Sequence, residues 1–167
     1  GDGIDDILIG AYGSDLGGDD SGAAYLILGS SLVSPDSVSL DQADMVFVGE
    51  RTDDYAGWSL AGVGDVDADG VDDLLIGAYG HDEGGTNAGA AYLIFGGSLG
   101  SEPTLDLSEA DHVFFGEAES DYAGRGVAGA GASASTGPGT AASLWAGSCV
   151  SAPAGTSAAA AACAAKA

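Results

Sequence analysis

The stretch "DGVDDLLIGAYGHD" at residues 69–82 occurs almost unchanged at residues 2–15, where it reads "DGIDDILIGAYGSD". A shift of 67 positions lays residues 2–64 on residues 69–131 without a gap, and 37 of the 63 pairs are identical. The identities are spread over the whole segment rather than concentrated in one motif. The chain therefore contains an internal repeat, and this repeat decides the fold.

The repeated sequence has the pattern of short strands joined by turns. Within one period we expect four strands, over residues 58–64, 73–79, 89–96 and 111–117. The middle two are almost continuous apolar runs, as expected for strands that are covered on both faces. The connections are rich in Gly, Asp, Ser and Pro, which form turns, and no segment has the apolar stripe of a helix. The sequence therefore predicts an all-β fold.

Four short strands in each period are typical of a β-propeller blade, which is a four-stranded antiparallel sheet. A blade cannot cover both of its own faces, and a closed ring usually takes about 4–8 of them. With about two to two and a half blades, this chain is expected to form an incomplete ring. We divide it into a partial blade lacking its first strand (1–54), a complete blade (55–121), the start of a third blade (122–131) and a low-complexity tail (132–167).

The tail differs sharply from the rest of the chain. It is rich in Ala, Ser, Gly and Thr, contains no Asp or Glu, and holds both cysteines, Cys149 and Cys163, which form no CxxC pair. One hypothesis is a disordered or linker segment. The other is translation in a shifted reading frame, because the repeat breaks off inside a motif. We assign the tail no function.

The net charge of −23 is concentrated in one part of the sequence. All 26 acidic residues lie within residues 1–122, where Arg51 is the only basic side chain. Such a surface repels nucleic acid and anionic lipid, and it attracts cations or a basic partner. Solubility or adaptation to a salty environment is the simplest explanation, but the clustering of acids in turns favours metal binding. We expect no nucleic-acid partner and, since no apolar run is long enough to span a bilayer, no membrane insertion in this segment.

The segment "DVDADGVDD" at residues 65–73 places acids at alternate positions of a tight loop. Alternate side chains can point inward together, and Gly70 at position 6 permits the positive φ that folds the loop back. The predicted metal ligands are the side chains of Asp65, Asp67, Asp69 and Asp73 and the carbonyl of Val71. Oxygen donors of this kind suit Ca²⁺ better than Mg²⁺. The alternative is an Asp-Gly turn with solvated acids, and Asp72 is expected to face solvent in either case.

Related metal sites are excluded by the spacing. An EF-hand loop has Glu at position 12, where this loop has Ile76, and zinc would require His or Cys. A truncated first copy of the loop supplies Asp2, Ile4 and Asp6, and we expect a weak or vacant site there. Because the sequence opens inside this motif, we expect it to be part of a longer protein. In the third copy Ala132, Ala134 and Thr136 replace the acids, so that site is expected to be lost.

The segment "YAGWSLAGVGDVDADGVDDLLIGAYG" at residues 55–80 resembles an FG-GAP repeat, the blade unit of the integrin α-subunit β-propeller and of many bacterial surface proteins. The motifs that name the repeat are degenerate here. Tyr55-Ala56-Gly57 stands for the aromatic–Gly pair, and Gly77-Ala78-Tyr79 has Tyr in place of Pro. The resemblance covers residues 1–131. It implies a ring of seven blades in a secreted or cell-surface protein, with calcium loops on one face and recognition loops on the other.

The recognition face would serve adhesion, through a protein or glycan ligand. Its expected loops are residues 13–21, 49–54, 80–88 and 116–121, all of which are acidic and most of which are rich in Gly. Residue by residue, the alternative is a set of variable, solvated loops. A second function class is a non-catalytic propeller appended to a secreted hydrolase such as a phospholipase.

We predict no catalytic residues in this segment. His81 and His112 align with Ser14 and Met45 of the other copy, so both are expected on the surface, and no Ser lies in a GxSxG motif. The aromatic residues at strand positions are expected to pack between blades rather than to bind sugar. They are Tyr12, Tyr25, Tyr55, Trp58, Tyr79 and Tyr92.

Overall fold

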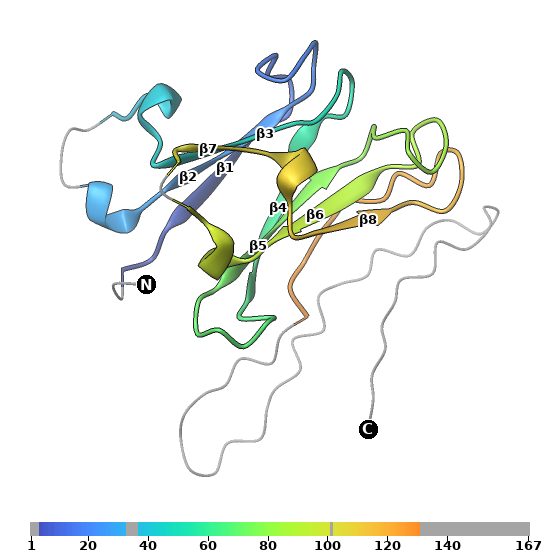
Figure 1. Cartoon of the computed structure of the whole chain (residues 1–167). Coiled ribbons are helices and arrows are strands. Elements are labelled where there is room, and N and C mark those ends of the chain that lie inside the picture. Colours follow the sequence, from blue (N-terminus) through green and yellow to red (C-terminus); the bar gives the residue numbers. More distant parts are fainter. Residues whose placement is uncertain (1–3, 33–36, 101, 131–167) are drawn as a thin grey trace. The chain divides into compact units, whose positions relative to one another are not determined.

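The computed structural model describes residues 4–32, 37–100 and 102–130. These residues form eight β-strands in two four-stranded sheets, with four short 3-10 helices between them (Figure 1). The all-β fold predicted from the sequence is confirmed. The tail and its alternatives lie outside the described residues.

The second sheet contains the four strands that the sequence predicts, with slightly different ends. They are β4 (Ala56–Gly64), β5 (Asp73–Ala78), β6 (Ala90–Ile94) and β8 (His112–Phe115). The sheet has the order β4-β5-β6-β8, and every neighbouring pair is antiparallel. The register of β4 against β5 shifts twice, which indicates bulges in the longest strand of the sheet.

The first sheet takes a strand from the second blade segment. Three of its strands, β1 (Ile7–Ala11), β2 (Ala23–Ile27) and β3 (Met45–Val48), correspond to β5, β6 and β8 by the shift of 67. The fourth, β7 (Thr104–Asp106), comes from the β6–β8 connection and pairs in parallel with β3. The sequence analysis missed β7, because three residues inside a turn-rich connection become a strand only when β3 offers them an edge.

The 3-10 helices recur at equivalent positions, 67 residues apart. They are η1 (Gly29–Ser31), η2 (Leu40–Gln42), η3 (Gly96–Ser98) and η4 (Leu107–Glu109). The same aspartate fixes η1 and η3: Asp44 accepts the N–H of Leu28 and the hydroxyl of Ser31, and Asp111 makes the equivalent pair of hydrogen bonds. None of the helices in the described residues is long and apolar enough to cross a membrane.

The core lies between the two sheets. Met45 and Phe47 of β3 pack with residues that follow in the second blade, and all of these side chains are buried. The second-blade members of this cluster include Ile76, Tyr92, Ile94 and Leu107. At the inner edge β1 lies beside β4, where a side chain at Gly10 would collide with the carbonyl of Gly57. Glycine is therefore required there by the close approach of two backbones.

The repeat supplies a matched pair for testing this core. Phe47 is fully buried, whereas its equivalent, Phe114, is 55 % exposed. We expect Phe47→Ala to lower the free energy of unfolding by about 3–5 kcal/mol, because it leaves a cavity between the sheets. Phe114→Ala should change it by less than about 1 kcal/mol. Urea unfolding at low protein concentration measures both, and equal effects would contradict the packing described here.

Candidate metal centre

The loop between β4 and β5 is folded back on itself by its own side chains. The two carboxylate oxygens of Asp65 accept the N–H groups of Asp69 and Gly70, each at 3.0 Å, and Asp67 also accepts the Asp69 N–H at 3.0 Å. Gly70 has a φ of 92°, as predicted, and Ala68 also takes the left-handed conformation with a φ of 65°. The backbone is therefore held in a closed loop by carboxylate acceptors.

Three of the predicted ligands converge in this loop. Asp65, Asp67 and Asp73 each offer a carboxylate oxygen, and these oxygens lie within 4.8 Å of one another. Asp65 and Asp67 are exposed, whereas Asp73 is fully buried at the start of β5. Its carboxylate accepts the N–H of Val66 at 2.7 Å and that of Gly96 at 2.9 Å. Asp73 therefore anchors the cluster to the sheet.

The other two predicted ligands lie outside this cluster. Asp69 turns its carboxylate toward its own loop, where it accepts the N–H of Val71 at 2.7 Å. The same carboxylate lies against Gly97 of η3 and leaves no room for a side chain there. Val71 packs its side chain beside Gly96. Asp72 is exposed, as expected.

The cluster carries more negative charge than its surroundings balance. Desolvation raises the pKa of Asp67 above its ordinary value, and the charges of Asp69, Asp73 and Asp65 raise it further. A bound cation would relieve this repulsion, and an all-oxygen set of carboxylates matches the ligands that Ca²⁺ takes. The residues present therefore fit a hard divalent cation.

The first copy of the loop keeps one feature of this arrangement. Asp6 accepts the N–H of Gly29 at 3.0 Å, as Asp73 accepts that of Gly96. Asp6 and Ile4 are both exposed. Asp2 and the third copy lie outside the described residues.

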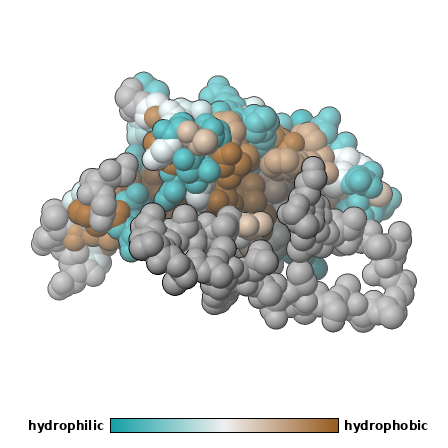
Figure 2. All heavy atoms as spheres, turned by 90° about the horizontal axis from the view of Figure 1, so that it is seen from below, coloured by the Kyte–Doolittle hydropathy of each residue, from teal (hydrophilic) through white to brown (hydrophobic). Residues whose placement is uncertain are grey.

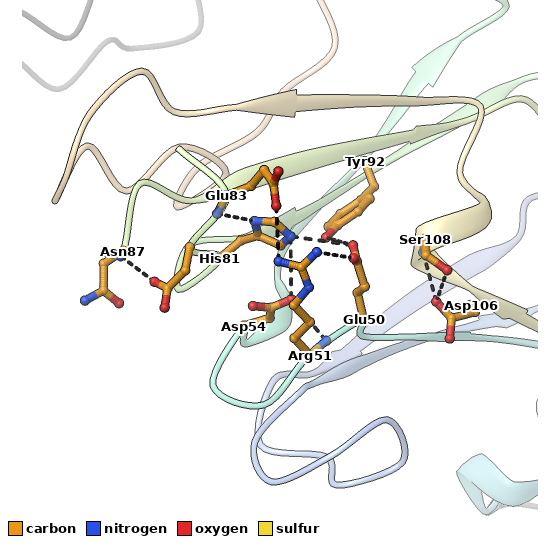
Figure 3. Close-up of polar contacts among 10 residues, drawn as sticks. Glu50, Arg51, Asp54, His81, Glu83, Asn87, Tyr92, Asp106 and Ser108 are labelled. Carbon is orange, nitrogen blue, oxygen red and sulfur yellow. Dashed lines mark hydrogen bonds and ion pairs between the residues drawn. The ribbon is translucent and has the colours of Figure 1, made fainter. Parts of the chain in front are cut away.

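A second polar cluster, which the sequence analysis missed, lies at the other end of the strands (Figure 3). The prediction of a surface position for His81 is wrong: this side chain is 1 % exposed, whereas His112 is exposed as predicted. His81 is covered because the β3–β4 loop, which carries Glu50 and Asp54, folds over it. Its Nδ1 accepts the N–H of Glu83 at 3.2 Å, so the ring proton belongs on Nε2.

Nε2 of His81 faces two carboxylates without a close hydrogen bond. It lies 3.5 Å from Glu50 Oε2 and 4.0 Å from Asp54 Oδ2, and neither contact meets hydrogen-bond criteria. Burial raises the pKa of Asp54 to about 6, although His81 and the N–H of Arg51 favour its charged form. Glu50 accepts the hydroxyl of Tyr92 at 3.2 Å, which ties the loop to β6 of the second sheet.

This cluster is a junction between blades rather than a catalytic site. Arg51 pairs with Glu50 at 3.0 Å and with Glu83 at 3.2 Å, so it joins the two loops from outside. His81 is sealed from substrate, and its Nε2 carries a proton in place of the lone pair that a metal would need. A partial signal existed in the sequence, since Glu50 and Asp54 recur 67 residues later, but Ser14 stands at the equivalent of His81.

Aromatic residues form a connected group near this junction. Tyr12 lies edge-on to Trp58 with ring centroids 4.8 Å apart, Trp58 lies edge-on to Tyr79 at 4.8 Å, and Tyr55 stacks on Tyr79 at 5.1 Å. Because Tyr12 follows β1 and Trp58 lies on β4, the predicted packing between blades is confirmed for this pair. The group remains open to solvent, however, with Tyr12 51 % and Trp58 41 % exposed.

Residues 56–94 match the model of the FG-GAP repeat family. The match spans β4, the acidic loop, β5 and β6. No curated protein matches the chain. FG-GAP repeats form β-propellers, so the second sheet is a propeller blade and the described residues form part of a propeller.

The buried Asp54 gives the junction a testable pH dependence. Its pKa in the folded chain lies above the ordinary value of 3.8, so the folded state binds the proton more tightly and this residue disfavours folding above about pH 6. We expect Asp54→Asn to stabilise the chain at pH 7.5, by on the order of 2 kcal/mol relative to its effect at pH 4. Urea unfolding across this pH range measures the difference.

Asp121 is the matched control for this experiment. It occupies the equivalent position and accepts the N–H of Ala118 as Asp54 accepts that of Arg51, but it is exposed. Asp121→Asn should shift stability by the same small amount at every pH. A stabilisation by Asp54→Asn that does not change with pH would contradict this assignment.

Proposed function

We propose that this chain is a calcium-binding β-propeller segment of an extracellular protein, secreted or on the cell surface, that serves adhesion or recognition of a protein or glycan. One observation carries the proposal. Asp65, Asp67 and Asp73 converge in the loop between the first two strands of a blade, inside the segment that matches the FG-GAP repeat. The localisation is supported by this family, whose repeats are typical of extracellular proteins.

Calcium would act here as a structural ion. Bound by Asp65, Asp67 and Asp73, with water completing its shell, it would neutralise the loop that joins β4 to β5. Asp69 would hold the loop closed through Val71 rather than bind the ion directly. Stabilisation then follows from mass action, because the unfolded chain lacks the preformed cluster.

Recognition is assigned to the opposite ends of the strands. β5 begins at the acidic loop and ends beside Tyr79, which precedes the loop at residues 80–88. Each of the four predicted recognition loops is flanked by a member of one connected aromatic group, namely Tyr12, Tyr55, Tyr79 or Tyr122. Exposed rings beside acidic loops suit the apolar faces of a sugar or a basic protein surface. We propose that the segment itself is non-catalytic.

The calcium site is tested by thermal unfolding with and without the ion. We expect calcium at about 100 times its dissociation constant to stabilise the chain by about 2.7 kcal/mol and to raise the melting temperature accordingly. Asp67→Asn should abolish the rise, because it removes one of three converging carboxylates. Isothermal titration of the same proteins with calcium gives the affinity directly.

Asp72 is the control for this measurement, since it lies in the same loop, is exposed and belongs to no cluster. Asp72→Asn should keep the full calcium response. Asp69→Asn should retain binding with reduced affinity. An equal response in wild type and Asp67→Asn would contradict the site.

Recognition is tested separately on a glycan array and on surfaces coated with extracellular-matrix proteins. We expect Trp58→Ala to weaken any binding at least about tenfold, the loss of about 1.4 kcal/mol, because it removes the central ring of the aromatic group. Binding that survives Trp58→Ala and Tyr12→Ala unchanged would exclude this surface.

A further inference from the structure

The two outer strands of the blades differ in their pairing. β3 is paired on both sides, with β2 and with the parallel strand β7, and the N–H of Val46 donates to the carbonyl of Pro103 at 2.8 Å. The equivalent strand β8 is paired only with β6, and among the described residues no strand lies on its outer edge. β8 therefore presents a free edge where β3 has a partner.

The side chains on β8 are uncovered in the same way. Phe47 of β3 is fully buried beneath the second blade, whereas its equivalent Phe114 is 55 % exposed and the neighbouring Phe115 is 46 % exposed. In the space-filling view of Figure 2, apolar residues reach the surface between the hydrophilic ones. We call β8 with Phe114 and Phe115 the acceptor end.

The first blade has the matching surface, which we call the donor end. Leu107, which is fully buried against the first sheet, corresponds to Leu40, which is only partly buried. Leu105 of β7 corresponds to Val38, which is 37 % exposed. Tyr92 of β6 is fully buried, whereas its equivalent Tyr25 is only partly buried. Each residue that the second blade buries against the first has an uncovered counterpart on the first blade.

The inner strands are complementary as well. β5 is flanked by β4, but its equivalent β1 is the edge of its sheet. The missing neighbour of β1 would be equivalent to β4, and residues 123–130 are the next copy of that sequence. This copy already starts as β4 does, because Ala123 bridges Gly89 in parallel just as Ala56 bridges Gly22.

We propose that a second copy of this chain docks its donor end on the acceptor end of the first, repeating the interface found inside the chain. Residues 37–39 of one copy would pair in parallel with β8 of the other, with Val38 opposite Phe114 as Leu105 lies opposite Phe47. Residues 126–129 would pair with β1 of the second copy, in the register that β4 shows with β5. The incomplete blades at the two ends would together form one complete blade.

This contact is heterologous, because the two ends are different surfaces of the molecule. Each copy that binds leaves one donor end and one acceptor end free, so association continues beyond the dimer. The residues that cross the contact do not oppose it by charge. Arg51 and Glu83, which pair inside the chain, are replaced at the new contact by Ala118 and Leu16.

A complementation experiment tests the proposal. Sedimentation velocity on the whole chain should show oligomers that grow with concentration. Val38→Asp blocks the donor end and Phe114→Asp the acceptor end, and each variant alone should be monomeric. An equal mixture should give 1:1 dimers and nothing larger, because only one intact donor and one intact acceptor remain. Far-ultraviolet circular dichroism checks the fold of both variants, whose substituted side chains are exposed.

Val66→Asp is the control, since Val66 is 56 % exposed in the acidic loop, away from both ends, and it should leave the oligomers unchanged. A wild-type chain that stays monomeric up to its solubility limit would overturn the proposal. So would a mixture of the two blocked variants that fails to dimerise, or oligomers that either variant retains. As a second readout, hydrogen exchange at residues 112–115 should slow as wild-type concentration rises.

Discussion

The burial of apolar side chains between neighbouring sheets is the interaction on which the rest of this structure depends. A four-stranded sheet with apolar residues on both faces is stable only when something covers each face. Here Phe47 of one blade packs with Ile76, Tyr92 and Leu107 of the next segment, and burial of a side chain of this size contributes about 1.5–3 kcal/mol. This packing sets the distance between the sheets, and it brings β1 close enough to β4 that glycine is needed at the contact.

The same packing separates two acidic regions at opposite ends of the strands. Asp73 and Asp54 are both buried aspartates, but their surroundings differ. Two backbone N–H groups donate to Asp73, so its charge is compensated within the acidic loop. Asp54 has one such donor and lies near Glu50, and burial raises its pKa to about 6. One residue type therefore serves as an anchor for a metal loop in one place and as a proton-binding group at a blade junction in the other.

The duplication makes the chain a record of its own interface. Every contact between the first and second sheets has a pair of equivalent positions on the outer surfaces, where the same residue types are exposed. β7 shows how far such a contact reaches, because it leaves its own blade and adds a parallel strand to the preceding one. Stability is therefore shared between blades, as in other repeat architectures.

Local pattern was sufficient for much of this protein. The repeat, the apolar runs and the turn residues predicted the four strands of the second blade, and Gly70 at position 6 predicted the folded-back loop, because strand periodicity and glycine conformation are properties of short segments. Tertiary structure decided the rest. It made β7 a strand by offering it the edge of β3, buried His81 under a loop from another blade, and turned Asp69 toward Val71 and Gly97 rather than the carboxylate cluster. These outcomes depend on residues far apart in the chain, whose meeting no local pattern encodes.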